Sequence, residues 1–297
     1  MIELLAKKKL VEEYLQKTPE KLSAFSFVSI FSWKDFFEFE FRVIKRNLCV
    51  FARNPVGVFL YLPPLGENID GDVVESCFDL MEKENKGNGV SRIENVSQSQ
   101  LEIFDKKRFS FFKKGYEYCY FKNDLIQLKG NAYKSKRSDY NHFASHYGGS
   151  FDLFEDKMTA ECLALYERWA EGRKKKYSSD IFHLMIEDNR SVHEVCMKHF
   201  KNLDLLGRVV KVNERIEAYS FGYKLNDETF CVLFEIANLS LKGISTFIFR
   251  EFCRDPKLKD LRFINVMDDF ELENVNKTKM SFHPVMLLPS YSVTRKN

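Results

Sequence analysis

The chain has 297 residues, of which 44% are hydrophobic and 30% charged, and phenylalanine alone accounts for 29 of them. This composition excludes collagen-like, low-complexity and mostly disordered proteins, because it supplies enough apolar side chains for a large core. The 46 basic and 43 acidic side chains leave a net charge of only +3, so the charge balance does not indicate a nucleic-acid-binding protein. At about 150 residues per domain, the length predicts two domains.

In chain order, hydrophobic spacing predicts an alternation of helices and short strands in the first half. The expected elements are a helix over residues 1–16, strands over 37–41 and 48–51, a helix over 72–83, a strand over 116–121 and a helix over 125–143. The turn at Pro63-Pro64-Leu65-Gly66 closes the strand pair, and residues 85–89 form a polar turn.

The second half shows a similar order of helices and strands. Its expected elements are a strand over residues 151–154, helices over 156–173 and 192–200, strands over 206–212, 216–223 and 229–236, a helix over 243–252, a strand over 263–266 and a further strand after Pro284. Short connections between consecutive strands indicate antiparallel pairing and an α+β fold. We expect two domains, 1–148 and 149–297, divided at Gly148-Gly149 without visible sequence repetition between them.

Neither a secretory signal nor a membrane-spanning helix is expected. The apolar residues 1–6 precede Lys7-Lys8-Lys9, the reverse of a signal sequence, and the longest uncharged stretches, 22–33 and 54–66, are shorter than the ~18 apolar residues of a spanning helix. The seven cysteines form no C-x-x-C pair and have mostly apolar neighbours, which predicts buried free thiols. We therefore expect a cytoplasmic protein.

The chain contains no phosphate-binding loop, no G-x-G-x-x-G, no H-E-x-x-H and no G-x-S-x-G motif. His142 and His146 are spaced to share one helix face, as metal ligands can be. No third ligand follows at a diagnostic spacing, so no metal site is expected.

Three segments carry residues with chemical potential. Basic and aromatic residues alternate between Lys106 and Arg137, which suits a phosphate-bearing partner, although a solvated helix face would look the same. Residues 234–243 join a strand to a helix whose N-terminus could hold an anion, or could simply be capped by Asn238 or Ser240. Acidic and basic residues in 265–284 could form an acid/base site or lie in surface loops.

Together, these segments resemble the soluble C-terminal domain family of the bacterial phosphatidylglycerol lysyltransferases. The matching residues are Asp124-Leu-Ile, Leu128-Lys129-Gly130, Tyr133, Lys136-Arg137, Asn141 and Phe143 in the first segment, Phe234-Glu235, Ala237-Asn238 and Lys242-Gly243 in the second, and Asn265, Asp268-Asp269, Lys279 and Ser281-Phe282-His283-Pro284 in the third. Residues 25–33 and 63–66 are also similar to that family, so the resemblance spans nearly the whole chain.

The resemblance implies two tandem GNAT-like domains with mixed, mostly antiparallel sheets, an arrangement shared with the Fem-type aminoacyltransferases. It also implies transfer of an aminoacyl group from aminoacyl-tRNA to an amine or hydroxyl of an acceptor. The acceptor, whether a lipid headgroup, a peptide or a small amine, stays open. Of the G-x-G/A loop of acetyl-CoA-using GNAT enzymes only Gly243 is present, so use of acetyl-CoA is not expected and no cofactor is implied.

The resemblance also implies roles for individual residues. Glu235 and Asp269 would orient or deprotonate the acceptor, and Lys279 would stabilise the oxyanion. The implied substrate-binding residues are Lys129, Lys136, Arg137, Asn141, Asn238, Lys242, Gly243, Asn265, Asp268 and His283. Among them, Lys136, Arg137 and Lys242 would hold phosphate or the tRNA end.

The chain departs from the family's usual residues at Ser138, Asp139, Glu271, Asn276 and Phe282, where Asn, His, Gly, Arg and Tyr are common. The arginine and the tyrosine hydroxyl would lie near the implied site. Their absence leaves open an alternative from another class, an inactive GNAT-like protein that binds an anionic ligand.

Overall fold

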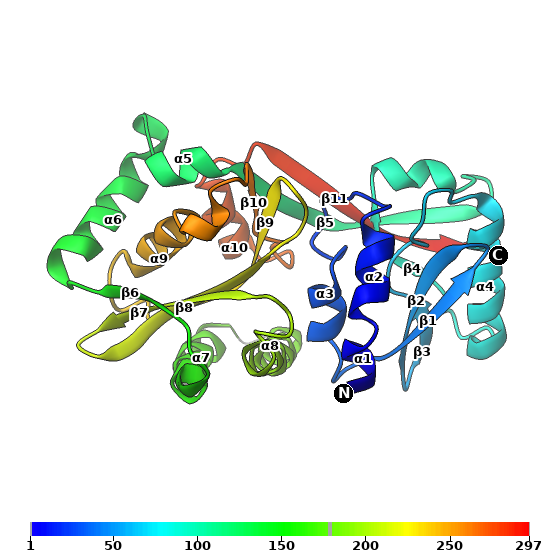
Figure 1. Cartoon of the computed structure of the whole chain (residues 1–297), viewed down its shortest axis with the longest axis horizontal. Coiled ribbons are helices and arrows are strands. Elements are labelled where there is room, and N and C mark those ends of the chain that lie inside the picture. Colours follow the sequence, from blue (N-terminus) through cyan, green and yellow to red (C-terminus); the bar gives the residue numbers. More distant parts are fainter. Residues whose placement is uncertain (1, 178–179, 297) are drawn as a thin grey trace. The chain divides into compact units, whose positions relative to one another are not determined.

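The structure is a computed structural model that describes residues 2–177 and 180–296 (Figure 1). The chain forms two compact units: the first unit comprises Met1–Tyr118, Met267–Asn276 and Met286–Asn297, and the second unit comprises Cys119–Val266 and Lys277–Val285. The expected division at residues 148–149 therefore falls inside the second unit, which begins at Cys119. The units do not coincide with the expected domains 1–148 and 149–297, which stay a prediction.

The first unit is a sheet with helices on both faces. Its helices are α1 (Ile2–Leu5), α2 (Lys8–Leu15), α3 (Phe27–Ser32) and α4 (Gly71–Asn85), and its strands are β1 (Glu38–Ile44), β2 (Asn47–Asn54), β3 (Gly57–Leu60), β4 (Ile93–Ser97), β11 (Met286–Arg295) and the part of β5 (Phe109–Phe121) up to Tyr118. The strand order is β1-β2-β3-β4-β11-β5, and only the β3–β4 pair is parallel among the pairs with a described register. Figure 1 shows α4 on one side of β1–β4 and α1–α3 on the other.

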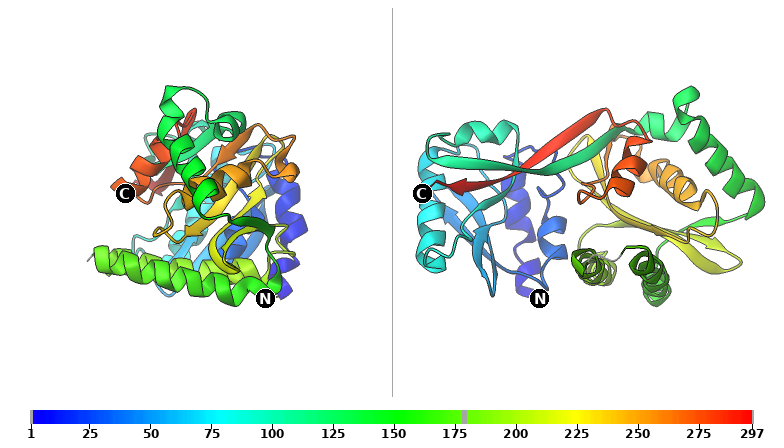
Figure 2. Two further views of the ribbon diagram at one scale, coloured as in Figure 1. Left: turned by 90° about the vertical axis from the view of Figure 1, so that its left-hand side faces the viewer. Right: turned by 180° about the vertical axis from the view of Figure 1, so that it is seen from behind.

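Strand β11 follows the second unit in the sequence but belongs to the first unit, where it lies beside β5 (Figure 2). Its last residue, Arg295, donates hydrogen bonds to Glu75, Asp79 and Glu82 of α4. The Arg295 guanidinium also lies 5.3 Å from the ring centroid of Phe78. Helix α4 thus fixes the end of the chain to the first unit by charge and by cation–π contact.

The second unit has the strand order β5-β10-β9-β8-β7-β6. Its strands are the end of β5, β6 (Ser150–Leu153), β7 (Leu206–Val212), β8 (Arg215–Lys224), β9 (Thr229–Ala237) and β10 (Phe263–Asn265), and its helices are α5 (Lys122–Gln127), α6 (Lys134–His146), α7 (Thr159–Lys176), α8 (Asp180–Lys198) and α9 (Ile244–Cys253). A further helix, α10 (Glu273–Met280), continues into this unit. Among the strand pairs with a described register in this unit, β9 and β10 run parallel and the others antiparallel.

Helices α7 and α8 cover one face of the β6–β9 strands, and α6 and α9 cover the other (Figure 1). Under α6 and α9 lies a cluster of buried apolar side chains from three strands and both helices. Its members are Phe143, Val210, Val212, Ala218, Ala237, Ile244, Phe247 and Ile248. This cluster fixes α6 and α9 relative to β8 and β9.

The predicted continuous helix over residues 125–143 is wrong. Helix α5 ends at Gln127, and α6 begins only at Lys134 after a short 3-10 turn over Asn131–Tyr133. Leu128 and Gly130 between them have φ angles of +49° and +83°, which a helix cannot contain. The single helix expected over residues 1–16 is divided into α1 and α2. The remaining expected helices and strands are confirmed with shifted ends, whereas α3, β3, β4 and α10 were not expected from the sequence.

The seven cysteines are free and buried, as predicted. Within residues 2–177 and 180–296, each helix is too short or too polar to cross a membrane.

Candidate functional site

The expected site residues are divided between the two units. Asp268 and Asp269 lie in the first unit, and all the other expected residues lie in the second.

In the second unit, the start of α6 meets the segment that follows α10. The Lys136 ammonium lies 4.1 Å from the ring centroid of Phe282, and burial lowers the pKa of this lysine. The Tyr133 hydroxyl donates a hydrogen bond of 3.0 Å to the Phe282 carbonyl, and its ring lies 5.1 Å from that of His283. Two of the three sequence segments thus come together, with Lys136 held on an aromatic ring.

The middle of α6 meets the segment that opens α9. Gly243 has a φ of +89°, and a Cβ atom there would lie 2.0 Å from the carbonyl oxygen of Asp139. Lys242 beside it is exposed, and its charge, together with burial and His146, lowers the pKa of His142. The expected Gly243 therefore permits close packing of two segments, while Lys242 keeps its ammonium at the surface.

The other expected substrate-binding residues of the first segment differ in their surroundings. Arg137 donates through Nη1 to the carbonyls of Leu128 and Gly130, so its guanidinium holds the loop between α5 and α6. Lys129 and Asn141 are exposed.

Asn238 stabilises the turn between β9 and α9. Its Oδ1 accepts hydrogen bonds from the backbone N–H of Ser240 at 3.1 Å and from the Ser240 hydroxyl at 2.7 Å. Its Nδ2 donates to Glu217 Oε2 at 2.8 Å. The expected cap of α9 by Asn238 or Ser240 is wrong, because the N-cap residue is Gly243 and no side chain caps it; Asn238 instead joins the turn to Glu217 of β8.

Glu235 lies on β9 beyond the last residue that pairs with β10, because the parallel pairing covers only 229–231 and 263–265. Its Oε2 atom is buried and has no hydrogen-bond partner among the residues that the structure describes. Burial raises the pKa of Glu235 to about 8. A carboxyl with this pKa gains and loses its proton near neutral pH, as a general base must.

Opposite Glu235 in the β8–β9 ladder stands Ser220, which is fully buried. Its hydroxyl oxygen likewise has no hydrogen-bond partner among the described residues. The sequence analysis missed Ser220. The available signal was a small polar residue inside the apolar run Ala218-Tyr219-Ser220-Phe221, but only the register shows that it faces an acid.

Lys279 and Asn265 mark the end of β10. The Lys279 ammonium donates a hydrogen bond of 2.7 Å to the carbonyl of Val266, directly after the strand, and the Tyr120 hydroxyl donates to the Lys279 carbonyl at 2.9 Å. Asn265 is fully buried within β10. Glu235 and Lys279 thus both lie past the point where β9 and β10 cease to pair.

In the first unit, Asp269 is buried and its carboxylate accepts hydrogen bonds from two side chains and one backbone N–H. The donors are the Tyr118 hydroxyl at 2.5 Å, Asn276 Nδ2 at 3.0 Å and the Glu271 backbone N–H at 3.0 Å. Desolvation and then the Asp269 carboxylate raise the pKa of Tyr118 to about 12, so this hydroxyl stays protonated. Asn276, one of the departures from the family pattern, is therefore hydrogen-bonded directly to Asp269, an expected catalytic residue. Asp268, the neighbour of Asp269 in the sequence, is half-buried.

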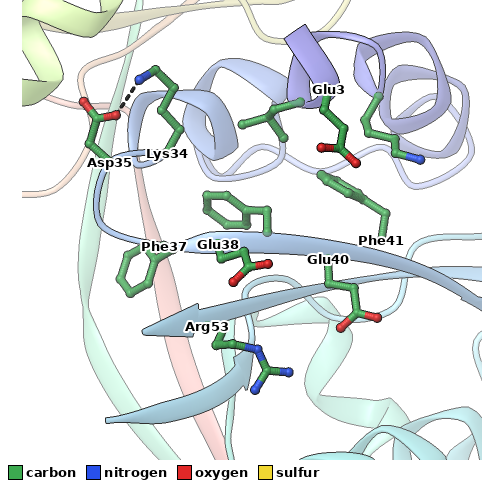
Figure 3. Close-up of a pocket in the computed structure, with 11 residues that line it drawn as sticks. Glu3, Lys34, Asp35, Phe37, Glu38, Glu40, Phe41 and Arg53 are labelled. Carbon is green, nitrogen blue, oxygen red and sulfur yellow. Dashed lines mark hydrogen bonds and ion pairs between the residues drawn. The ribbon is translucent and has the colours of Figure 1, made fainter. Parts of the chain in front are cut away.

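Two pockets lie away from these residues. A pocket of about 620 Å³ in the first unit lies between α1 and β1, and Phe37, Phe41, Glu38, Glu40 and Arg53 are among the residues that line it (Figure 3). A second pocket, of about 450 Å³, is lined by residues 121–124 and 259–262 of the second unit. Neither contains an expected site residue. Among the described residues, no three His, Cys, Asp or Glu side chains are grouped as a metal ion would require.

Comparison with known proteins places this geometry in a family. The model of the family described as "Phosphatidylglycerol lysyltransferase, C-terminal" matches residues 16–294. A search of curated proteins finds no match.

Three solved structures illustrate the likeness. A conserved protein of unknown function from Bacteroides thetaiotaomicron is 26% identical, with a TM-score of 0.86 over 98% of this chain and 97% of that one. L-PGS from Bacillus licheniformis is 17% identical, with a TM-score of 0.69 over 97% and 92%. A tandem GNAT protein from the clavulanic acid biosynthesis pathway is 8% identical, with a TM-score of 0.55 over 98% and 96%.

These likenesses confirm the expected α+β, tandem GNAT-like fold. Because the family model covers nearly all of its residues, the chain belongs to the family of phosphatidylglycerol lysyltransferase C-terminal domains.

Proposed function

We propose that this chain is an aminoacyltransferase that moves an aminoacyl group from aminoacyl-tRNA to an amine or hydroxyl of an acceptor, in the cytoplasm and without acetyl-CoA. Family membership supports this activity, since the family is described as a lysyltransferase. The observation that carries the proposal is Glu235, a carboxyl group with a buried, unpartnered oxygen and a pKa raised to about 8 by burial. Such a group can take a proton from a nucleophile near neutral pH.

In the proposed reaction, Glu235 removes the proton from the acceptor as its nitrogen or oxygen attacks the ester carbonyl carbon. The carbonyl oxygen gains the negative charge, which the Lys279 ammonium stabilises. The bond to the ribose oxygen then breaks, and that oxygen takes up the proton held by Glu235. Lys136 and Lys242 bind phosphates of the tRNA end, and Asp269 orients groups of the first unit through Tyr118 and Asn276.

The test is transfer from labelled aminoacyl-tRNA to a panel of acceptors, with the full chain. Glu235→Gln should lower turnover by about 100-fold or more, because a positioned base contributes on this scale. Glu228→Gln, an exposed glutamate just before the same strand, is the matched control and should keep wild-type turnover. Unchanged transfer by the Glu235→Gln variant would remove Glu235 from the mechanism.

A second candidate, an inactive protein that binds an anionic ligand, is favoured by one observation. Asn276, which stands where the family commonly has an arginine, donates a hydrogen bond to the Asp269 carboxylate, so the positive charge expected beside this implied catalytic residue is missing. Binding of tRNA that weakens steeply with salt, without release of the label to any acceptor, would select this candidate.

A further inference from the structure

Ser220 and Glu235 are direct partners in the antiparallel β8–β9 ladder, so their side chains lie on the same face of the sheet. This is the face covered by α9, since Ala218 and Ala237, two residues away on each strand, belong to the apolar cluster under that helix. Ser220 Oγ and Glu235 Oε2 are both buried and have no hydrogen-bond partner among the described residues. Two buried polar atoms without a described hydrogen-bond partner thus belong to directly paired residues of neighbouring strands.

In the part of the chain that the structure describes, no cation contributes to the shifted pKa of Glu235. Burial alone accounts for the shift of its pKa. From α9 the titratable group in electrostatic reach is the Cys253 thiol, whose pKa is raised by burial and then by Glu235. The charged side chains of α9 have other hydrogen-bond partners. Arg250 donates to the Ile126 carbonyl, and Glu251 accepts from Tyr140 and from Arg254.

Leaving two buried polar atoms unpaired costs about 1–3 kcal/mol each, and native proteins rarely keep such groups without a ligand or another use for them. A hydroxyl of a ligand would satisfy the hydrogen bonds but would leave an ionised carboxylate unbalanced. A primary ammonium supplies both a positive charge and three N–H donors. Although its Oε2 atom is buried, Glu235 as a whole residue is only half-buried. It lies on the part of β9 that follows the residues paired with β10.

We propose that Ser220 and Glu235 form a subsite that binds a primary ammonium group. The ammonium donates one hydrogen bond to Glu235 Oε2 and one to Ser220 Oγ. This inference rests on the proposed function for the origin of the group, because both of its substrates can carry one. It is either the α-ammonium of the aminoacyl donor or the amine of the acceptor.

The experiment is calorimetric titration of the full chain with small amines, without tRNA. L-alaninamide represents the donor head group, ethanolamine represents an acceptor amine, and N-acetyl-L-alaninamide lacks the ammonium. The amine from the correct source should bind, and the acetylated compound should not. Binding requires ionised Glu235, so the affinity should rise with pH up to about 8, with release of a proton at lower pH.

Variants separate the two side chains. Ser220→Ala should weaken binding about tenfold, as expected for one lost hydrogen bond, and Glu235→Gln should weaken it about 100-fold. Ser150→Ala, an exposed serine on β6 of the same unit, should leave the affinity unchanged. Thermal unfolding of each variant checks that it is folded.

The outcomes distinguish the subsite from the proposed function. Equal binding of the acetylated compound, or unchanged affinity in both variants, overturns the subsite even if aminoacyl transfer is observed. Amine binding that depends on Ser220 and Glu235 supports the subsite even if no transfer is found. Competition of the bound amine with aminoacyl-tRNA identifies the donor as its source, and lack of competition identifies the acceptor.

Discussion

A Cβ atom at Gly243 would lie 2.0 Å from the backbone carbonyl oxygen of Asp139. This contact joins the start of α9 to the middle of α6, and the φ of +89° at Gly243 adds a second requirement for glycine. Gly243, which the family resemblance implies to be substrate-binding, is thus needed first for packing.

Gly243→Ala should destabilise the second unit by about 2 kcal/mol or more, because the methyl group meets backbone and a positive φ is unfavourable for alanine. The two tryptophans make this measurable, since Trp33 lies in the first unit and Trp169 in the second. In a Trp33→Phe background, urea unfolding followed by fluorescence reports the second unit. Gly172→Ala is the control, because no atom lies within 4 Å of its added Cβ and alanine favours the helix interior of α7. Equal stability of the two variants would contradict the packing role.

Tyr118→Phe should destabilise the first unit by about 1–3 kcal/mol, because it removes a donor from the buried Asp269 carboxylate. Asp269→Asn should lower the free energy of unfolding by a similar amount. The double variant should lower it by less than the sum of the two single losses, since both changes remove the same hydrogen bond. Unfolding is followed through Trp33 in a Trp169→Phe background. Tyr116→Phe, at an exposed tyrosine two residues earlier, should change stability by less than about 0.5 kcal/mol. Additive losses would show that the two groups are not coupled.

Arg137→Ala and Lys242→Ala should have opposite signatures. The first removes a charged donor from the carbonyls of Leu128 and Gly130 and should lower stability by about 2 kcal/mol, with the salt dependence of tRNA binding unchanged. The second removes an exposed ammonium and should reduce the slope of log affinity against log salt by about 1, with unchanged stability. The reverse pattern would return Arg137 to the phosphate-binding residues.

Local patterns in the sequence were sufficient for most elements of both units. The alternation of Phe37 to Phe41 predicted β1, and the spacing of apolar residues over 156–173 predicted α7. Helix α3 was not predicted because all six of its residues are buried, so it has no polar face and its sequence shows no helical period of apolar residues. Strand β4 escaped because its pairing with β3 and β11 is long-range.

The candidate site was predictable by residue type but not by surroundings. The sequence named Glu235, Lys136 and Asp269, yet the Phe282 ring under Lys136 and the Tyr118 hydroxyl on Asp269 come from segments more than a hundred residues away along the chain. Ser220 became visible only through the strand register. Burial, which sets the pKa of Glu235, is likewise a property of packing and not of any local motif.

Glu235→Gln should stabilise the second unit, increasingly so as the pH rises. The folded pKa of about 8 lies above the ordinary value of 4.5, so between these values the folded state holds a proton that the unfolded chain has lost. Wild-type stability therefore falls as the pH rises from about 4.5 to 8 and is constant above, because each pH unit in this window costs about 1.4 kcal/mol. Glutamine does not titrate, so the difference in free energy of unfolding between variant and wild type should be smallest near pH 4.5 and reach on the order of 4 kcal/mol at pH 8.

The measurement is the same urea unfolding through Trp169, repeated between pH 4.5 and 8.5, with Glu228→Gln as the control that should show no such trend. A flat difference for Glu235→Gln would mean that the carboxyl is hydrated in the folded state. The buried, unpartnered oxygen on which both the proposed base and the ammonium subsite depend would then be absent in solution. A rising difference combined with lost transfer would instead show that Glu235 is kept at a cost in stability, as expected for a group used in catalysis rather than in folding.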